Sequence, residues 1–275
     1  MNRFNTTKEE LARLGSEFNS EALPLLEKLY YTSFWILLDK KPTKKIIKQI
    51  YTEAIEYCDK TKAYADWQSW IRRIWMREIL DFYTPKENDF QTVYDFIDFV
   101  EVNMKEVEAL FRKNNLKSVH SEVELIKSLN KMPSVLRIPL ILKEIHSLNY
   151  EKIAELIDIP DGVVATRIYR ARKLFYLLLK GNFNYQEQKG TGLSDNFKPI
   201  IFEKRKCASF IDDELSEKQA GEFNKAVESE SEYKSEIFIQ EEIKKILKNL
   251  SLNSAETKKL KVKIERKANK KFRNI

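Results

Sequence analysis

Cysteine and histidine are scarce in this chain of 275 residues. Its two cysteines, Cys58 and Cys207, lie far apart, and its two histidines are His120 and His146. No disulfide framework or C-x-x-C motif can be built from them, which is typical of a reducing compartment, and we expect a cytoplasmic protein. A structural zinc site needs about four Cys or His ligands, and no glycine-rich phosphate loop is present. The sequence therefore predicts no metal site, no cofactor and no enzymatic activity.

Long hydrophobic runs are also absent. The longest, such as Phe34–Leu38 and Leu174–Leu179, fall far short of the roughly 20 residues of a membrane span. The N-terminus has no apolar core of the signal-peptide type, so we expect no membrane insertion. Only 6 glycines, with abundant Lys, Glu, Leu and Ile, favour helix over sheet. A net charge of +7 suits an anionic partner, with nucleic acid the leading candidate and a membrane surface also compatible.

Residues 147–173 have the pattern of two helices joined by a tight turn. Asn149 can cap the first helix through its side-chain oxygen, and an apolar face follows at helical spacing. Pro160, within the break at 158–162, suits the first turn of a second helix, where Asp161 adds a favourable negative charge. This layout is typical of a helix-turn-helix that reads duplex DNA.

The second helix divides into two faces. One carries the apolar residues Val164, Ile168, Ala171, Phe175 and Leu178. The opposite wall carries Ala165, Thr166, Tyr169, Arg170 and Lys173, flanked by Arg167 and Arg172. Its donors suit phosphate oxygens and guanine edges. A solvated basic face on an ordinary amphipathic helix is the alternative interpretation.

The segment from Met132 to Leu178 resembles the region-four domain of extracytoplasmic-function (ECF) bacterial sigma factors. The matching residues are Leu148, Tyr150, Glu151, Ile153, Ala154, Glu155, Gly162, Val164, Arg167, Arg170, Ala171 and Arg172. Ala165 departs from the family by removing a cation from the presumed DNA face. The resemblance implies recognition of an upstream promoter element by what we call the recognition set: Asp161, Thr166, Arg167, Tyr169, Arg170, Arg172 and Lys173.

Residues 23–83 resemble the region-two domain of the same family more loosely. Three successive helices are expected, with a turn at 39–43 and a loop at 59–66 before the run from Trp67 to Ile74. The resemblance implies an opening set that captures an extruded promoter base and nearby phosphates: Lys60, Lys62, Tyr64, Trp67, Arg72, Arg73 and Arg77. A solvated loop and tryptophans packed in a core are the alternatives.

The same resemblance implies that the helix around Ile46 docks on core polymerase through a polymerase-docking set: Lys45, Lys48, Gln49, Ile50 and Tyr51. The family's helix is acidic here, whereas this one is basic. Like charges across an interface are disfavoured. The protein therefore meets a differently charged polymerase surface, docks mainly through Gln49, Ile50 and Tyr51, or docks weakly.

The C-terminal segment opens with a short run, Cys207 to Glu217, that resembles the start of zinc anti-sigma domains. The zinc-ligand positions of that family fall near Ala226, Glu230 and Tyr233, none of which is a ligand, so we predict no zinc. Residues 207–245 hold 11 acidic against 5 basic residues, and 258–275 hold 9 basic residues and one acid. The acidic part can fold back on the basic domains and restrain or support them. The lysine-rich end can hold DNA non-specifically or form a disordered solubilising tail.

Together these features predict an all-α protein built from two small helical domains and an extension. We expect a region-two-like domain at 1–84, a linker at 85–122, a region-four-like helix-turn-helix domain at 123–182, a flexible linker at 183–206 and an anti-sigma-like extension at 207–275. The implied function is an ECF sigma factor in transcription initiation, with core RNA polymerase and promoter DNA as partners. Regulation is expected from a separate anti-sigma factor or from the extension. The alternative is a sigma-derived helix-turn-helix regulator that no longer engages polymerase.

Overall fold

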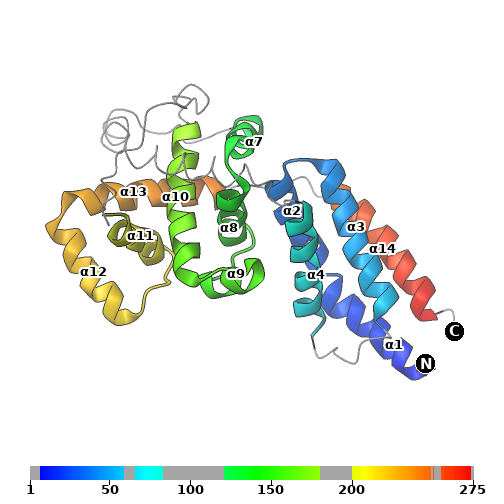
Figure 1. Cartoon of the computed structure of the whole chain (residues 1–275). Coiled ribbons are helices and arrows are strands. Elements are labelled where there is room, and N and C mark those ends of the chain that lie inside the picture. The colour runs from blue at the N-terminus through cyan, green and yellow to red at the C-terminus, as the bar shows by residue number, and fades with distance from the viewer. Residues whose placement is uncertain are drawn as a thin grey trace. The chain divides into compact units, whose positions relative to one another are not determined.

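The computed structural model describes residues 7–58, 66–82, 121–179, 200–248, 250 and 255–273. Secondary structure in these ranges is helical, as predicted (Figure 1). The chain divides into two compact units: unit 1 comprises residues 1–84 and 251–275, and unit 2 comprises residues 85–250. Most of the two predicted linkers lies outside the described residues.

Unit 1 begins with α1 (Lys8–Glu17), which runs into a short π-helix (Phe18–Ala22). Three longer helices follow: α2 (Leu25–Leu37), α3 (Lys40–Tyr57) and α4 (Trp67–Phe82). Their core is aromatic. The indole N–H of Trp75 donates to Ser33 Oγ over 2.8 Å, and the Tyr51 hydroxyl donates to the carbonyl oxygen of Ala22 over 2.8 Å.

The turn predicted at 39–43 is shorter than expected. Asp39 caps α3 by accepting from the backbone N–H of Lys41, so the helix begins at Lys40. Pro42 is accommodated because the backbone N–H groups of a first turn have no partner within the helix. The residues from Lys40 to Thr43 therefore belong to α3.

Unit 1 is completed by α14 (Ala255–Arg273), from the other end of the chain. This helix contacts α1, α2 and α3 and lies beside α3 (Figure 1). The close approach to α1 depends on Gly15, because a Cβ atom there would meet Phe272 Cβ at 3.0 Å. The structure thus distributes the segment expected as one extension, 207–275, over both units.

Unit 2 is built around one long helix, α10 (Asp161–Leu179). The helices α7 (Glu122–Lys131), α8 (Ser134–Glu144) and α9 (Tyr150–Ile157) precede it and pack against it. Three helices follow: α11 (Ile200–Ile211), α12 (Glu217–Ser229) and α13 (Ser231–Lys248). Residues 200–206, expected to be part of a flexible linker, thus lie within α11.

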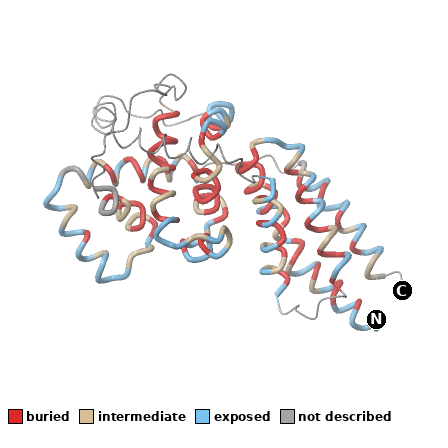
Figure 2. The backbone as a smooth tube through the Cα atoms, in the orientation of Figure 1, coloured by how far each residue is buried: buried red, intermediate tan, exposed pale blue. Residues whose placement is uncertain are grey.

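The position of α10 explains its burial. Helices α8 and α9 contact one side of it, and both α11 and α13 also pack along it. From Val164 to Leu178 its residues are buried or half-buried, so the helix is enclosed rather than exposed along one wall (Figure 2). The wall that sequence periodicity assigned to solvent or DNA is therefore covered in part: Tyr169 and Lys173 are buried, whereas Thr166 and Arg170 are half-buried.

Candidate nucleic-acid interface and the segment that covers it

The helix-turn-helix forms as the sequence predicts. Asn149 caps α9 by accepting from the backbone N–H of Lys152 over 2.9 Å. The helix ends when Asp158 adopts a left-handed conformation with φ 53°. Pro160 then accepts from the backbone N–H of Val164 over 3.2 Å as α10 begins. The break predicted at 158–162 is shorter than expected, because Asp161 and Gly162 already belong to α10. The two helices and the turn between them follow from local capping and turn chemistry, which is why the sequence predicted them.

The N-terminal part of α10 remains accessible. Asp161 is exposed, and Thr166, Arg167 and Arg170 are half-buried. The Thr166 hydroxyl donates to the carbonyl oxygen of Gly162, and Arg205 of α11 donates to the same oxygen over 3.3 Å. This end of the recognition set could meet a duplex, although α11 already reaches it.

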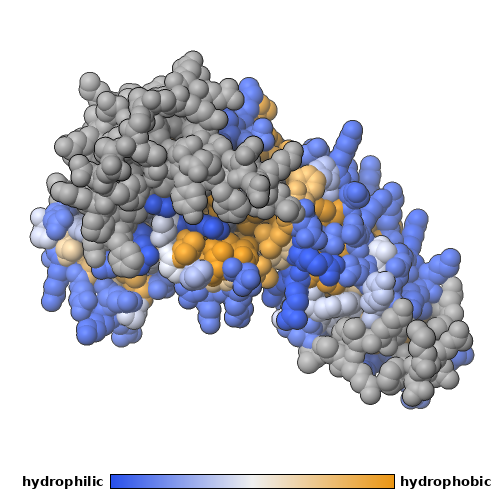
Figure 3. All heavy atoms as spheres, in the orientation of Figure 1, coloured by the Kyte–Doolittle hydropathy of each residue, from blue (hydrophilic) through white to orange (hydrophobic). Residues whose placement is uncertain are grey.

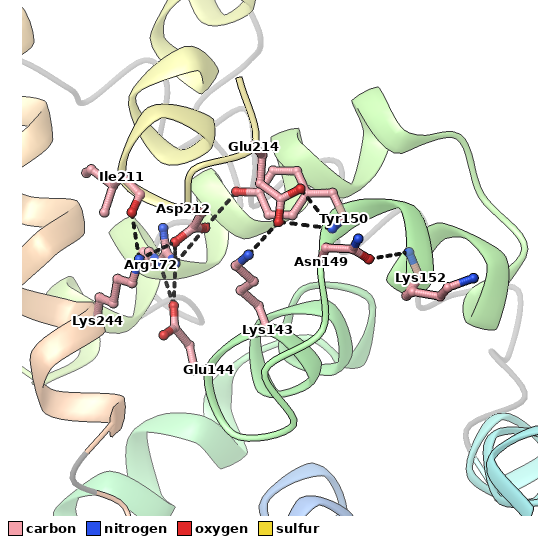
Figure 4. Close-up of polar contacts among 10 residues, drawn as sticks. All are labelled: Lys143, Glu144, Asn149, Tyr150, Lys152, Arg172, Ile211, Asp212, Glu214 and Lys244. Carbon is pink, nitrogen blue, oxygen red and sulfur yellow. Dashed lines mark hydrogen bonds and ion pairs between the residues drawn. The ribbon is translucent and has the colours of Figure 1, made fainter. Parts of the chain in front are cut away.

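Arg172 lies in a buried ion network. Its side chain is fully buried, and its Nε donates to Glu144 of α8 over 2.8 Å. Its Nη2 contacts both carboxylate oxygens of Asp212, at 2.8 and 2.9 Å, where α11 ends (Figure 4). Lys244 of α13 also contacts Asp212, over 2.8 Å. Burial opposes both charges, yet the two carboxylates hold the pKa of Arg172 above its ordinary value, and Arg172 holds the pKa of Asp212 below its own.

Lys173 and Tyr169 share a second buried acid. Lys173 Nζ lies 2.6 Å from one carboxylate oxygen of Glu236 on α13, and the Tyr169 hydroxyl donates to the other over 3.0 Å. The Gln240 side-chain amide donates to the Tyr169 carbonyl oxygen over 3.1 Å. Three members of the recognition set, Tyr169, Arg172 and Lys173, are thus enclosed in this conformation and cannot touch DNA within it.

A third carboxylate sits where α9 begins. Glu214 accepts from the backbone N–H of Tyr150 over 3.2 Å and from Lys143 Nζ over 2.5 Å (Figure 4). The Tyr150 hydroxyl donates to Asp212 over 2.8 Å. A helix N-terminus favours an anion because its first N–H groups and the helix dipole point at it.

Sequence reasoning did not single out Asp212, Glu214 or Glu236. The excess of acidic residues at 207–245 pointed to the segment, but not to individual carboxylates. Each pairs with a residue 60 or more positions away on another helix, and local periodicity carries no such information.

The polymerase-docking set divides by exposure. Lys45, Lys48 and Gln49 are exposed on α3. Ile50 and Tyr51 are fully buried, because they fall on the stripe of α3 that packs into unit 1. Of the alternative that docks mainly through Gln49, Ile50 and Tyr51, only Gln49 is therefore accessible in this conformation.

The opening set is also divided. Trp67 is buried, with its ring centroid 5.4 Å from that of Phe18, so it is a core residue here. Arg72 is half-buried, whereas Arg73 and Arg77 are exposed, Arg77 in contact with Glu53. Lys60, Lys62 and Tyr64 lie outside the described residues. Within the described part of the chain, no helix is long and apolar enough to cross a membrane, and no cluster of His, Cys, Asp or Glu could hold a metal ion.

The geometry of α9, the turn and α10 defines a helix-turn-helix domain of the DNA-binding class. Residues 122–175, which span α7 to most of α10, match the family model described as Sigma-70, region 4. An ECF RNA polymerase sigma-E factor of Haemophilus influenzae is 22% identical over 178 residues, covering 61% of this chain and 93% of the relative. Proteins of the same name from Escherichia coli K12 and Salmonella typhimurium LT2 are each 25% identical over 138 residues, covering 46% of this chain and 69% of the relative. These similarities support a sigma factor role in transcription initiation.

Proposed function

We propose that this protein is an ECF-type sigma factor whose own C-terminal segment restrains it. It binds core RNA polymerase and directs promoter recognition and opening when α10 is accessible. The observation that carries the restraint is the pairing of Asp212 and Glu236 with Arg172 and Lys173 of the recognition set. The relatives' names and the region 4 match support the sigma factor part of the proposal.

The restraint follows from competition for the same cations. A phosphate and a carboxylate both satisfy Arg and Lys donors, and Lys173 cannot serve both at once. Arg172 also pairs with Glu144 of α8. Part of its role is therefore structural, whether α11 and α13 cover α10 or have left it. The apparent promoter affinity is then the intrinsic affinity multiplied by the fraction of molecules in which α11 and α13 have left α10.

The exposed residues of unit 1 supply the remaining contacts of the proposal. Lys45, Lys48 and Gln49 dock on a polymerase surface of negative charge, since their own charge is reversed relative to the family. Arg73 and Arg77 follow promoter phosphates near the opening site. In unit 2, the accessible end of α10 makes the first contacts with the upstream element, through Asp161, Thr166, Arg167 and Arg170.

Glu236→Ala tests the restraint. It removes the carboxylate that neutralises the buried Lys173 while α11 and α13 cover α10, which disfavours this covered state by about 2–5 kcal/mol. We expect promoter-dependent transcription with purified core polymerase to rise at least about tenfold, because each 1.4 kcal/mol is a factor of ten. Glu222→Ala, an exposed residue of α12, is the matched control and should leave output unchanged.

Unchanged or lower output from Glu236→Ala, with the domain still folded, would contradict restraint and indicate that the segment supports activity. A point substitution is sharper than truncation after Lys189. Truncation would also remove α14, whose Leu260, Ile264 and Ala268 are buried in unit 1.

Arg170→Ala in the Glu236→Ala background tests sequence reading. If Arg170 contacts a guanine, binding to the upstream element should weaken by about 1–3 kcal/mol. A uniform loss on all duplexes, with a shallower salt dependence, would instead identify Arg170 as a phosphate contact.

The second candidate is a sigma-derived regulator that binds DNA without polymerase. The basic surface of α3 and the burial of Ile50 and Tyr51 favour it. Pull-down of purified core polymerase with the full chain and with Glu236→Ala distinguishes the two candidates. Capture by either form supports the sigma factor, and failure of both rejects it.

A further inference from the structure

The lysine-rich end of the chain is an ordered part of unit 1. Helix α14 buries Thr257, Leu260, Ile264 and Ala268 at steps of three, four and four. This stripe faces α1, α2 and α3, and Lys267 Nζ also lies 2.7 Å from a carboxylate oxygen of Glu56 on α3. The orientation of the helix is fixed by this packing, so its opposite face is fixed too.

Four cations form one row on that opposite face. Lys259, Lys263, Arg266 and Lys270 follow each other at steps of four, three and four, and all four are exposed. Such spacing places side chains above one another on a helix. At 1.5 Å per residue the row spans about 16 Å, a length over which duplex DNA carries about 10 phosphate charges.

The row is unfavourable for the isolated protein. Like charges at i, i+3 and i, i+4 destabilise a helix by about 0.2–0.5 kcal/mol per pair, and the row contains three such pairs. Lys258 and Lys261 on the same helix and Lys45 and Lys48 on the neighbouring α3 are also exposed and add to the positive field. Figure 3 shows hydrophilic side chains over the outer sides of α3 and α14. An arrangement that opposes local stability is expected where a ligand of opposite charge compensates for it.

We propose that Lys259, Lys263, Arg266 and Lys270 form a phosphate-binding surface for the backbone of duplex DNA, independent of base sequence. Three exposed lysines and one exposed arginine in a row supply donors and positive charge for phosphate oxygens. This site lies on unit 1 and is exposed while α11 and α13 cover α10. It therefore gives the protein non-specific contact with DNA in the restrained state.

The test is the salt dependence of binding to a duplex that lacks any promoter. Lys259, Lys263, Arg266 and Lys270 are all changed to Gln in the full-length chain. For every phosphate that the variant no longer neutralises, the slope of log affinity against log salt should fall by about 0.9. We expect a reduction of about 3–4 and an affinity at least about tenfold lower at 0.1 M KCl.

The matched control changes the same number of exposed cations on α12 and α13: Lys218, Lys225, Lys234 and Lys248 to Gln. It produces the same net charge without touching the row. Circular dichroism checks that both variants keep their helices. An unchanged slope in the row variant overturns the proposal, and so does an equal reduction in the control, which would reflect net charge alone.

A second arm asks whether the row binds an acidic protein surface instead. Loss of core polymerase capture with an unchanged DNA slope would assign the row to protein docking and overturn the proposal. Both readouts are independent of promoter activity. A protein that fails as a sigma factor but has a shallower salt slope in the row variant still supports the DNA surface.

Discussion

The two parts of the C-terminal segment pack on their units by different chemistry. Helices α11 and α13 bury apolar residues such as Ile239 and Ile243, and they add buried ion pairs to α10, with Asp212 on Arg172 and Glu236 on Lys173. Helix α14 meets α1–α3 through an apolar stripe and leaves most of its cations exposed. Buried ion pairs contribute little net stability, because desolvation offsets the Coulomb attraction, yet they discriminate strongly between partners. The first contact is therefore suited to competition with a charged ligand, and the second to permanent attachment.

The largest effect should come from breaking the ionic contact in unit 2. Arg172→Ala leaves Glu144 and Asp212 buried without their main cation, and we expect a loss of about 3–5 kcal/mol in the free energy of unfolding. Denaturant unfolding followed by circular dichroism measures it. All four tryptophans lie within residues 1–84, so circular dichroism rather than tryptophan fluorescence is the direct probe of unit 2. Lys152→Ala, which removes an exposed pair with Glu155, should cost less than about 1 kcal/mol.

Breaking the apolar contact of α14 in unit 1 should lower the free energy of unfolding by nearly as much. Leu260→Ala removes a buried side chain from α14 and should lower the free energy of unfolding by about 2–5 kcal/mol. Tryptophan fluorescence should report this transition. Val262→Ala, at an exposed position of the same helix, is the control. Equal effects of Leu260→Ala and Val262→Ala would mean that α14 is not anchored by its stripe.

Cys207 can report the separation of α11 and α13 from α10. Its thiol is buried, and burial raises its pKa to about 12, so almost no thiolate exists at pH 8. We expect slow labelling by iodoacetamide in a Cys58→Ser background and labelling at least about tenfold faster with Glu236→Ala, which disfavours the covered state by about 2–5 kcal/mol. Mass spectrometry of the labelled protein gives the rates. Equal rates in the two proteins would argue against opening.

The smallest effect concerns pH. Burial alone would raise the pKa of Asp212, but Arg172 and Lys244 hold it below the ordinary value. A depressed carboxyl pKa contributes stability that is complete above the unfolded value of about 3.9 and is lost as pH falls through the folded value. The stability advantage of the natural protein over Asp212→Asn should therefore be constant above about pH 5 and shrink towards pH 3.

Glu144 acts in the opposite direction, since burial raises its pKa. It is present in both proteins, so the comparison largely removes its contribution. Unfolding midpoints measured in urea at several pH values give the difference. A difference that grows as pH falls would contradict the ionised state of Asp212.

Local chemistry was enough to predict the helix-turn-helix. Asn149 as a cap, the break at 158–162 and the periodic apolar residues all act within a few positions of each other. The same reasoning made the turn at 39–43 too long, because Asp39 caps α3 and the helix already begins at Lys40. It also could not show that Trp67 and Tyr51 are core residues, because an aromatic residue on a helix suits a core and a binding surface equally well.

The sequence by itself determined the helical class, the helix-turn-helix and the opposite charges of residues 207–245 and 258–275. These properties depend on composition, capping and spacing, which are local. Only the tertiary structure decided that the acidic part encloses Tyr169, Arg172 and Lys173, and that the basic part joins unit 1 with its cation row outward. The reason is physical. The 11 acidic residues in 207–245 can form many ion pairs whose free energies are nearly equal in water. Burial selects Asp212 and Glu236, because a charge can be enclosed only when it is paired.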